Sequence, residues 1–187
     1  MKELSLNILD IAENSLKAGA TLTRIELTEE DDVLTVRILD NGCGMTPEVL
    51  EGVINPFYTT RTTRKVGLGV PLIKLAAEQT GGSLSITSRH ESTHPVDHGT
   101  EVTARFVTSH IDCAPLGDIV STLRTLIQGH PDQDFCFSHV RGARCVSLDT
   151  REMRQILGDD IPLNAPEILV WISESLNEQY AETNLLQ

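Results

Sequence analysis

Apolar residues near the N-terminus recur every three or four positions over residues 4–16, which predicts a helix that ends near Gly19. The opposite side of this helix carries Asp10, Asn14 and Lys17 within one narrow sector. We therefore expect the helix to pack through one side and to present an acid, an amide and a cation through the other.

Four stretches alternate between apolar and polar residues, as strands do. They span residues 23–30, 33–40, 83–89 and 100–107, and an acidic turn joins the first two. In the second stretch Asp40 and three aliphatic residues occupy alternate positions, so they lie on the same side of the strand. A carboxylate is therefore directed at the side of the strand that should be buried.

The residues between these strand pairs predict two helices and a long loop. A threonine cap followed by proline begins a short helix over 46–54, and a helix over 70–82 stops at glycine. Residues 55–69 are rich in Thr, Gly and Arg and are long for a connector, which favours a binding loop or lid. This order of elements predicts an α+β fold, a two-layer α/β sandwich with a mixed sheet and helices on one face.

The pattern changes after the first 108 residues. The elements predicted there are a helix over 114–129, a hairpin over 134–150 and helices over 149–158 and 165–182. We expect two domains, residues 1–108 and a small C-terminal α/β appendage of residues 109–187 that binds a partner or regulates the first. Phe135, Phe137 and Trp171 are expected in the core of the appendage.

Composition narrows the classes of function. The chain of 187 residues is 40% hydrophobic and has a formal net charge of -12, which disfavours broad binding to nucleic acid or anionic membranes. No apolar run is long enough to cross a membrane, and we expect a cytoplasmic protein. The four cysteines are scattered without a CxxC pair, so reduced thiols and a metal site assembled in three dimensions both stay open.

Polar side chains and glycines from separate segments would meet at one edge of the sandwich. Asp10, Asn14 and Lys17 offer a base, an amide oxygen for a hard metal ion and a cation for phosphate. Asp40 can accept a hydrogen bond from an exocyclic amine, and the hydroxyl of Thr100 can bridge to it. The glycines that would let a flat base or a phosphate approach the backbone are Gly42, Gly44, Gly67 and Gly69.

Four stretches together resemble a known family. They are "AENSLKAGAT", "DNGCGM", "NPFYTTR" and "GLGVPLIK". Their combination is similar to the ATP-binding domain shared by DNA gyrase B subunits, the Hsp90 chaperone, histidine kinases and mismatch-repair ATPases, the GHKL superfamily. The resemblance covers residues 1–108 and implies a Bergerat-type ATP-binding fold with ATP and Mg²⁺ as ligands.

The resemblance implies a role for each matching position. Asn14 would be the magnesium ligand, Asp10 would activate water and Lys17 would contact phosphate. Asp40 would bind the adenine amino group, with Thr100 beside it. The other positions implied to contact ATP are Gly42, Gly44, Met45, the lid residues Thr59, Thr60, Arg61, Arg64 and Lys65, and the second glycine box Gly67, Leu68, Gly69 and Val70.

One departure from the family changes the expected activity. Asp10 stands where hydrolysing members carry glutamate, so its carboxylate stops about 1.5 Å nearer the backbone and can miss the attacking water. Slow hydrolysis of ATP and transfer of its γ-phosphate to a partner protein, as in the small anti-sigma-factor serine kinases, are therefore both expected.

Other functions stay open beside these. In one, a non-catalytic sensing module, ATP would order residues 59–65 and reshape a surface that a partner protein recognises. A DNA-repair-type ATPase clamp is disfavoured by the acidic charge, and the state of oligomerisation is open. The sequence "HESTH" at residues 90–94 matches a zinc-peptidase motif, but it falls in a predicted loop, whereas that chemistry needs a helix.

Overall fold

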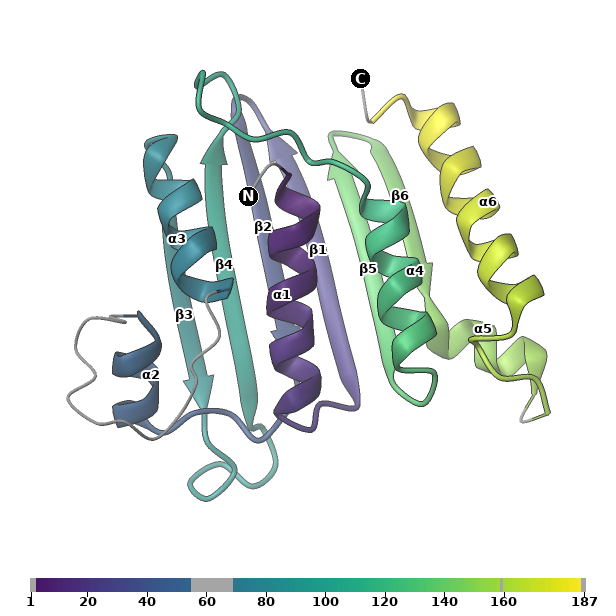
Figure 1. The fold of residues 1–187 in the computed structure, drawn as a ribbon, viewed down its shortest axis with the longest axis horizontal. Coiled ribbons are helices and arrows are strands. Elements are labelled where there is room, and N and C mark those ends of the chain that lie inside the picture. Colours follow the sequence, from purple (N-terminus) through teal and green to yellow (C-terminus); the bar gives the residue numbers. More distant parts are fainter. Residues whose placement is uncertain (1–2, 55–68, 159, 186–187) are drawn as a thin grey trace.

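A computed structural model describes residues 3–54, 69–158 and 160–185. The helices are α1 (Leu4–Lys17), α2 (Pro47–Ile54), α3 (Gly69–Gln79), α4 (Ile119–Gly129), α5 (Thr150–Leu157) and α6 (Pro166–Thr183) (Figure 1). The strands are β1 (Leu22–Glu30), β2 (Val33–Asp40), β3 (Ser83–Arg89), β4 (Gly99–Val107), β5 (Asp134–Arg141) and β6 (Arg144–Asp149). Among these described helices, none combines the length and the apolar composition needed to cross a membrane.

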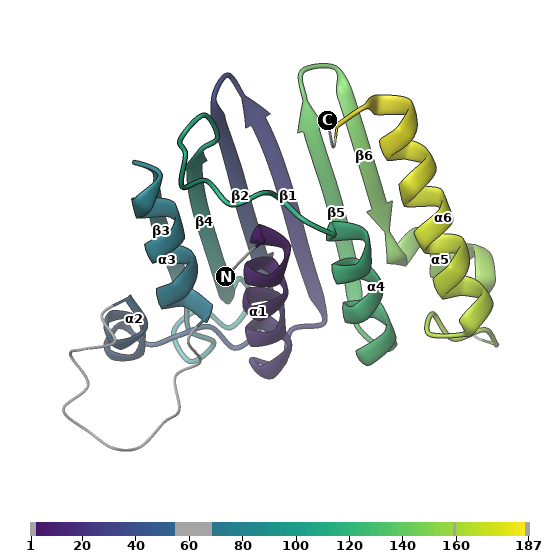
Figure 2. The ribbon, with the colours of Figure 1, turned by 45° about the horizontal axis from the view of Figure 1, so that its top comes forward.

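The strands form one six-stranded sheet in the order β3-β4-β2-β1-β5-β6. Strands β1 and β5 pair in parallel, and the four other neighbouring pairs are antiparallel. Helices α1, α3 and α4 lie over one face of the sheet, and α6 lies beside β6 at the edge of the sheet (Figures 1 and 2). The predicted α+β sandwich with a mixed sheet is therefore confirmed.

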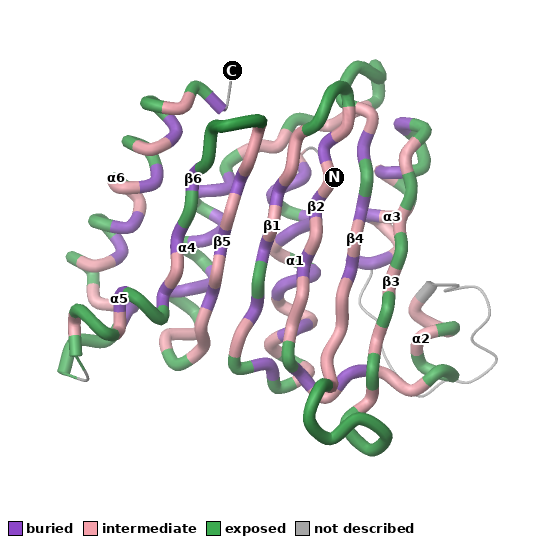
Figure 3. Tube along the Cα trace, turned by 180° about the vertical axis from the view of Figure 1, so that it is seen from behind, coloured by how far each residue is buried: buried purple, intermediate pink, exposed green. Residues whose placement is uncertain are grey.

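The opposite face of the sheet is not covered by any of the described helices (Figure 3). Its side chains are mainly polar, and Arg37 at its centre pairs with Glu26 and Glu101 on the neighbouring strands, each at 2.9 Å. One apolar and one polar face is the usual pattern of a sheet packed on one side only. The alternation in the sequence therefore identified which side of β2 meets the helices.

The residues after position 108 continue the same sheet. Strand β5 aligns with β1 from Leu22↔Asp134 to Glu29↔Arg141, and one hydrophobic core includes side chains from both parts of the chain. The boundary predicted after residue 108 falls in the connection between β4 and α4, and the predicted appendage supplies two strands to the common sheet.

The helix predicted over 114–129 begins later than expected, at Ile119. Asp118 caps it by accepting a hydrogen bond from the backbone N–H of Ser121 at 2.8 Å. The residues before the cap bind α1 instead, because the Pro115 carbonyl accepts the N–H of Leu4 at 2.9 Å. The connection between the two parts of the chain therefore holds the first turn of α1 in place.

The aromatic residues assigned to the core divide into two groups. Phe135 and Phe137 are 0% and 1% exposed, which confirms their prediction. Trp171 is 53% exposed, so its assignment to the core was wrong. On α6 the buried positions include Ile172 and Leu176, and residue 171 points away from them.

Candidate functional site

Asp40 ends β2 on the side of the sheet that the helices cover, as its parity predicted. The hydroxyl of Ser15 on α1 donates to Asp40 Oδ2 at 2.8 Å. The backbone N–H groups of Gly42 and Thr100 donate to Asp40 Oδ1 at 2.9 and 3.2 Å. These donors fix the orientation of the carboxylate and leave Oδ2 with the capacity to accept one more hydrogen bond.

A cleft of about 530 Å³ lies beside this carboxylate, within the size range of small-molecule sites. Its walls are largely apolar and include Ile86 and Val102 from the sheet and Val53 from α2. An apolar slot with a carboxylate in its wall suits a flat ring that carries an exocyclic amine. The predicted site residues that line it are Asn14, Lys17, Asp40, Gly44, Met45, Val70 and Thr100.

The glycines after Asp40 are needed for close packing of the backbone. Gly44 has a φ of +68°, and a Cβ built there would lie 2.0 Å from the carbonyl oxygen of Arg89. A Cβ at Gly42 would lie 2.9 Å from the carbonyl oxygen of Ala18. The sequence predicted that these glycines make room for a base, whereas the chain itself occupies the space beside them.

Two segments hold the loop that contains these glycines. The N–H of Cys43 donates to the Ala18 carbonyl at the end of α1, and the Cys43 carbonyl accepts the N–H of Glu91, both at 2.9 Å. His98 Nδ1 lies 2.5 Å from the carbonyl oxygen of Gly42. The loop is therefore fixed between α1 and the β3–β4 connection.

Two serines that the sequence did not single out organise the site. Besides Ser15, Ser88 on β3 accepts the N–H of Met45 at 2.8 Å, and its Oγ lies 2.8 Å from the hydroxyl of Thr100. The expected bridge from the Thr100 hydroxyl to Asp40 is thus made by the Thr100 backbone N–H. Ser15 lies on the buried side of α1, and Ser88 shares the half-buried side of β3 with Leu84 and Ile86. A hydroxyl on the side of an element that faces the core needs a partner, which is the signal that could have identified both serines.

The predicted phosphate end of the site lies where α1 meets α3. A Cβ at Gly69, the first residue of α3, would lie 3.0 Å from Asp10 Cβ and 3.7 Å from Asn14 Nδ2. Glycine therefore lets the N-terminus of α3 approach these side chains, and free N–H groups at a helix N-terminus favour anions. Asp10 is exposed and is not among the residues that line the cleft, whereas Lys17 is exposed and lines it.

Several predicted residues cannot be placed. The positions outside the described residues are Thr59, Thr60, Arg61, Arg64, Lys65, Gly67 and Leu68. Their assignment to a lid and to the second glycine box stays a prediction.

Histidine and cysteine give no sign of a preformed metal centre. Within the described ranges, no group of three or more His, Cys, Asp or Glu side chains is arranged to hold a metal ion. The "HESTH" segment lies in the connection between β3 and β4, as its flanks predicted. All four cysteines are free thiols, and burial raises the pKa of Cys113 and Cys136.

Comparison with known proteins identifies the family. The family model described as "Histidine kinase-, DNA gyrase B-, and HSP90-like ATPase" matches residues 2–110. The chain belongs to this ATPase family. Membership confirms the resemblance found in the four sequence stretches and supports ATP binding by the chain.

Similar curated proteins are histidine kinases and a sporulation kinase. A putative NtrY-like sensor histidine kinase of Rickettsia felis is 30% identical over 99 residues, which is 52% of this chain and 16% of that protein. Sporulation kinase D of Bacillus subtilis is 33% identical over 103 residues, 55% of this chain and 19% of that protein. The chain thus matches less than a fifth of the length of these relatives.

Two similar solved structures are an ATPase domain and a domain of a DNA repair protein. The Aquifex aeolicus MutL ATPase domain complexed with ADP gives a TM-score of 0.52 at 17% identity, covering 73% of this chain and 60% of that one. The N-terminal domain of a DNA repair protein gives 0.57 at 16% identity, covering 85% and 58%. At these identities the likeness establishes the fold.

Proposed function

We propose that the chain binds Mg-ATP in the cleft beside Asp40 and either hydrolyses it slowly or transfers the γ-phosphate to a partner protein. The observation that carries this proposal is the Asp40 carboxylate, which is oriented by Ser15, Gly42 and Thr100 and lines the apolar cleft. Because its donors are already in place, the remaining acceptor position needs no rearrangement to take the amino group of adenine.

The same cleft has groups suited to phosphate and magnesium at α1. Asn14 is half-buried and lines the cleft close to Gly69, and Lys17 lines it further along the helix. Asn14 would hold the magnesium ion through its amide oxygen, and Lys17 would balance phosphate charge. When bound, magnesium neutralises the triphosphate and polarises its oxygens.

The position of Asp10 supports slow turnover. It lies one helical turn before Asn14 and against the start of α3, where it could accept a proton from water or from a hydroxyl of a partner. Its short side chain reaches less far than glutamate would. A sensing module that binds ATP without turning it over is the second candidate, and the same shortened carboxylate favours it.

The experiment that separates these functions uses γ-labelled ATP. The purified chain is incubated with the label and magnesium, alone and with cell extract, beside the variants Asp10→Asn and Asp40→Asn. Free phosphate that Asp10→Asn abolishes indicates an ATPase, and a labelled protein band that the same variant abolishes indicates a kinase. Retained binding without either product indicates a sensor.

Two results would contradict the proposal. Undetectable binding of ATP to the unmodified chain would remove the proposed site. Full turnover in Asp10→Asn would show that Asp10 is not the base.

A further inference from the structure

The outer side of α6 exposes the only tryptophan of the chain. Trp171 is 53% exposed and its neighbour Val170 is 48% exposed, while Leu169 and Ile172 are buried against the sheet and α4. Tryptophan contributes strongly to binding when it fills a pocket on a partner. Adjacent exposed apolar side chains on a surface helix therefore mark a place where a partner could gain affinity.

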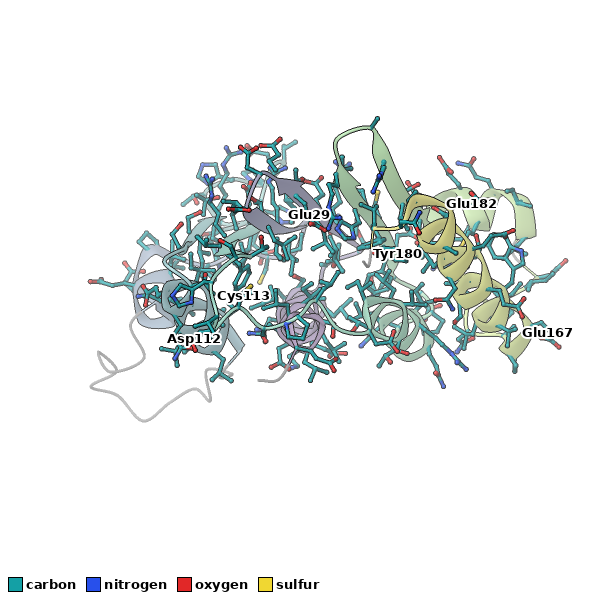
Figure 4. The ribbon with its side chains drawn as sticks, turned by 90° about the horizontal axis from the view of Figure 1, so that it is seen from above. Glu29, Asp112, Cys113, Glu167, Tyr180 and Glu182 are labelled. Atoms are coloured by element: carbon teal, nitrogen blue, oxygen red, sulfur yellow. The ribbon has the colours of Figure 1, made fainter. Side chains whose placement is uncertain are left out.

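Acidic residues surround this tryptophan. At 100° per residue, Trp171 and the glutamates fall within an arc of about 80° centred opposite the buried side of α6. In Figure 4, Glu167 and Glu182 lie on the side of α6 away from the sheet, while Tyr180 lies on the side that faces it. The glutamates of this acidic stripe are Glu167, Glu174, Glu178 and Glu182, and all of them are exposed.

The acidic stripe does not stabilise the helix that carries it. The α6 sequence contains no Lys or Arg, and the ion pairs of the described residues include none of the four glutamates. Glu174, Glu178 and Glu182 follow one another at i,i+4 spacing, where like charges destabilise a helix by about 0.2–0.5 kcal/mol for each pair. Glu178 and Glu182 also lie toward the helix C-terminus, where the macrodipole disfavours negative charge. A pattern that weakens local structure is expected where function requires it.

The structure also limits how a partner could bind here. The side-chain amide of Gln179 accepts the N–H of Ser147 at 2.9 Å and donates to its carbonyl at 3.2 Å. Ser147 lies in the middle of β6, so α6 covers the backbone groups that an added strand would need. A partner at this edge would therefore contact the side chains of α6.

We infer that the outer side of α6 docks a basic protein surface, in which Lys and Arg side chains surround an apolar group that covers Trp171 and Val170. A second copy of the chain would place glutamate against glutamate, and nucleic acid and anionic lipid carry the same sign of charge as the stripe. Helix α6 packs on β6 and α4, at the opposite side of the sheet from α2 and α3 (Figure 1). No residue of α6 lines the cleft beside Asp40, so docking on α6 does not cover that cleft. The inference does not depend on the proposed ATP chemistry.

The test selects binding partners from a displayed library of helical peptides of random sequence, with the full-length chain as the target and no nucleotide present. We expect the enriched peptides to carry Lys or Arg at helical spacing on both sides of an apolar residue. Because Trp171 is the only tryptophan, its emission should shift to shorter wavelength as such a peptide covers it. No enrichment, or enrichment of acidic or uncharged peptides, would overturn the inference.

Matched variants locate the binding of the enriched peptides. Calorimetry should show at least tenfold weaker binding to Trp171→Ser and at least fivefold weaker binding to the double variant Glu174→Gln/Glu178→Gln. The control Glu30→Gln/Asp32→Asn removes the same charge from the exposed end of β1 and the turn that follows it, and should bind within twofold of the parent. Equal weakening by the control, or full binding by the double variant, would show that the peptides read net charge or another surface.

Two further measurements distinguish peptide docking from misfolding and from self-association. The double variant on α6 should unfold at the same or a higher temperature than the parent, because like-charge repulsion is relieved, so its lost binding cannot come from misfolding. In sedimentation experiments we expect no dimer of the parent chain that dissociates when Trp171 is replaced by serine. Such a dimer would contradict the inference and assign the surface to a second copy of the chain.

Discussion

Two carboxylates point to the same side of the sheet at opposite ends of its strands and have different surroundings. Asp40 is the last residue of β2, and Glu29 lies near the end of β1. Because these strands are antiparallel, the two residues lie at opposite ends of the strand pair. Alternation along the strand directs both side chains to the helix side. Their neighbours decide which of them is available to a ligand.

The partners of Glu29 are all supplied by the chain. Its Oε1 lies 2.8 Å from His139 Nε2, and its Oε2 accepts the Nε–H of Arg141 at 2.9 Å. His139 is 0% exposed, and its Nδ1 lies 3.1 Å from the hydroxyl of Tyr180 on α6. In Figure 4, Tyr180 and Glu29 lie near one another between the sheet and α6. Both oxygens of Glu29 thus accept hydrogen bonds that connect β1 to β5 and, through His139, to α6. Asp40 Oδ2, in contrast, can accept one more hydrogen bond and lines a cleft.

The largest expected effect is on nucleotide affinity. Asp40→Asn places an amide where the adenine amino group needs an acceptor, and we expect ATP binding to weaken by at least about 30-fold, or 2 kcal/mol. The melting temperature should change little, since the amide oxygen can still accept from Gly42 and Thr100. Calorimetry with Asp32→Asn as a control for charge checks this. Unchanged affinity would remove Asp40 from the site.

The matching change at the other carboxylate should affect stability instead. Glu29→Ala leaves the buried N–H of His139 and the guanidinium of Arg141 without their acceptor, which should lower the free energy of unfolding by about 2 kcal/mol. Affinity for ATP should stay within twofold. Urea unfolding and calorimetry on the same samples check both parts, and a loss of affinity without a loss of stability would reverse the assigned roles.

Stability should also depend on pH through His139. Burial lowers the pKa of His139 from its usual 6.5, and this outweighs the opposite influence of Glu29. Well above pH 6.5 the histidine is neutral in both the folded and unfolded chain, so it contributes no pH dependence there. Below pH 6.5 the unfolded chain takes up the proton first, so the free energy of unfolding should fall as the pH is lowered. Urea unfolding at pH 7.5 and 5.5 should show a smaller difference in His139→Gln than in the parent, and an equal difference would be evidence against this origin.

The smallest expected effect concerns the orientation of Asp40. Ser15→Ala removes the donor to Asp40 Oδ2, and we expect ATP to bind about fivefold more weakly, corresponding to about 1 kcal/mol. Ser173→Ala is the control, because Ser173 also donates from a helix, to the carbonyl of Leu169 on α6. If both variants bind ATP equally, Ser15 does not orient the carboxylate.

Much of the fold could be predicted because the deciding signals are local. Alternation identified β1 to β4 and placed Asp40 on the buried side, and helical spacing put Asn14 and Lys17 together. The pairing of β5 with β1 joins residues more than 100 positions apart, which no local pattern reports. Trp171 lies in the run "ILVWI", in which every residue is apolar. The spacing of apolar residues therefore does not show which of them face the core.

The sequence led to candidate residues by their type, whereas the contacts among them could not be predicted. Residue type led to Asp40 and Asn14 as candidates, since few side chains can accept from an amine or bind magnesium, and both residues line the cleft. The reason for Gly44 could not be read from the sequence, because it depends on the backbone of Arg89, which is distant in the chain. Ser15 and Ser88 were missed for the same reason, since their partners lie on other elements.

A crystal structure of the chain with magnesium and a non-hydrolysable ATP analogue is the most direct test of the site. We expect the amino group of adenine within hydrogen-bond distance of Asp40, and the phosphates between Asn14 and the start of α3 at Gly69. A nucleotide bound elsewhere, or one whose adenine faces away from Asp40, would contradict the proposed site.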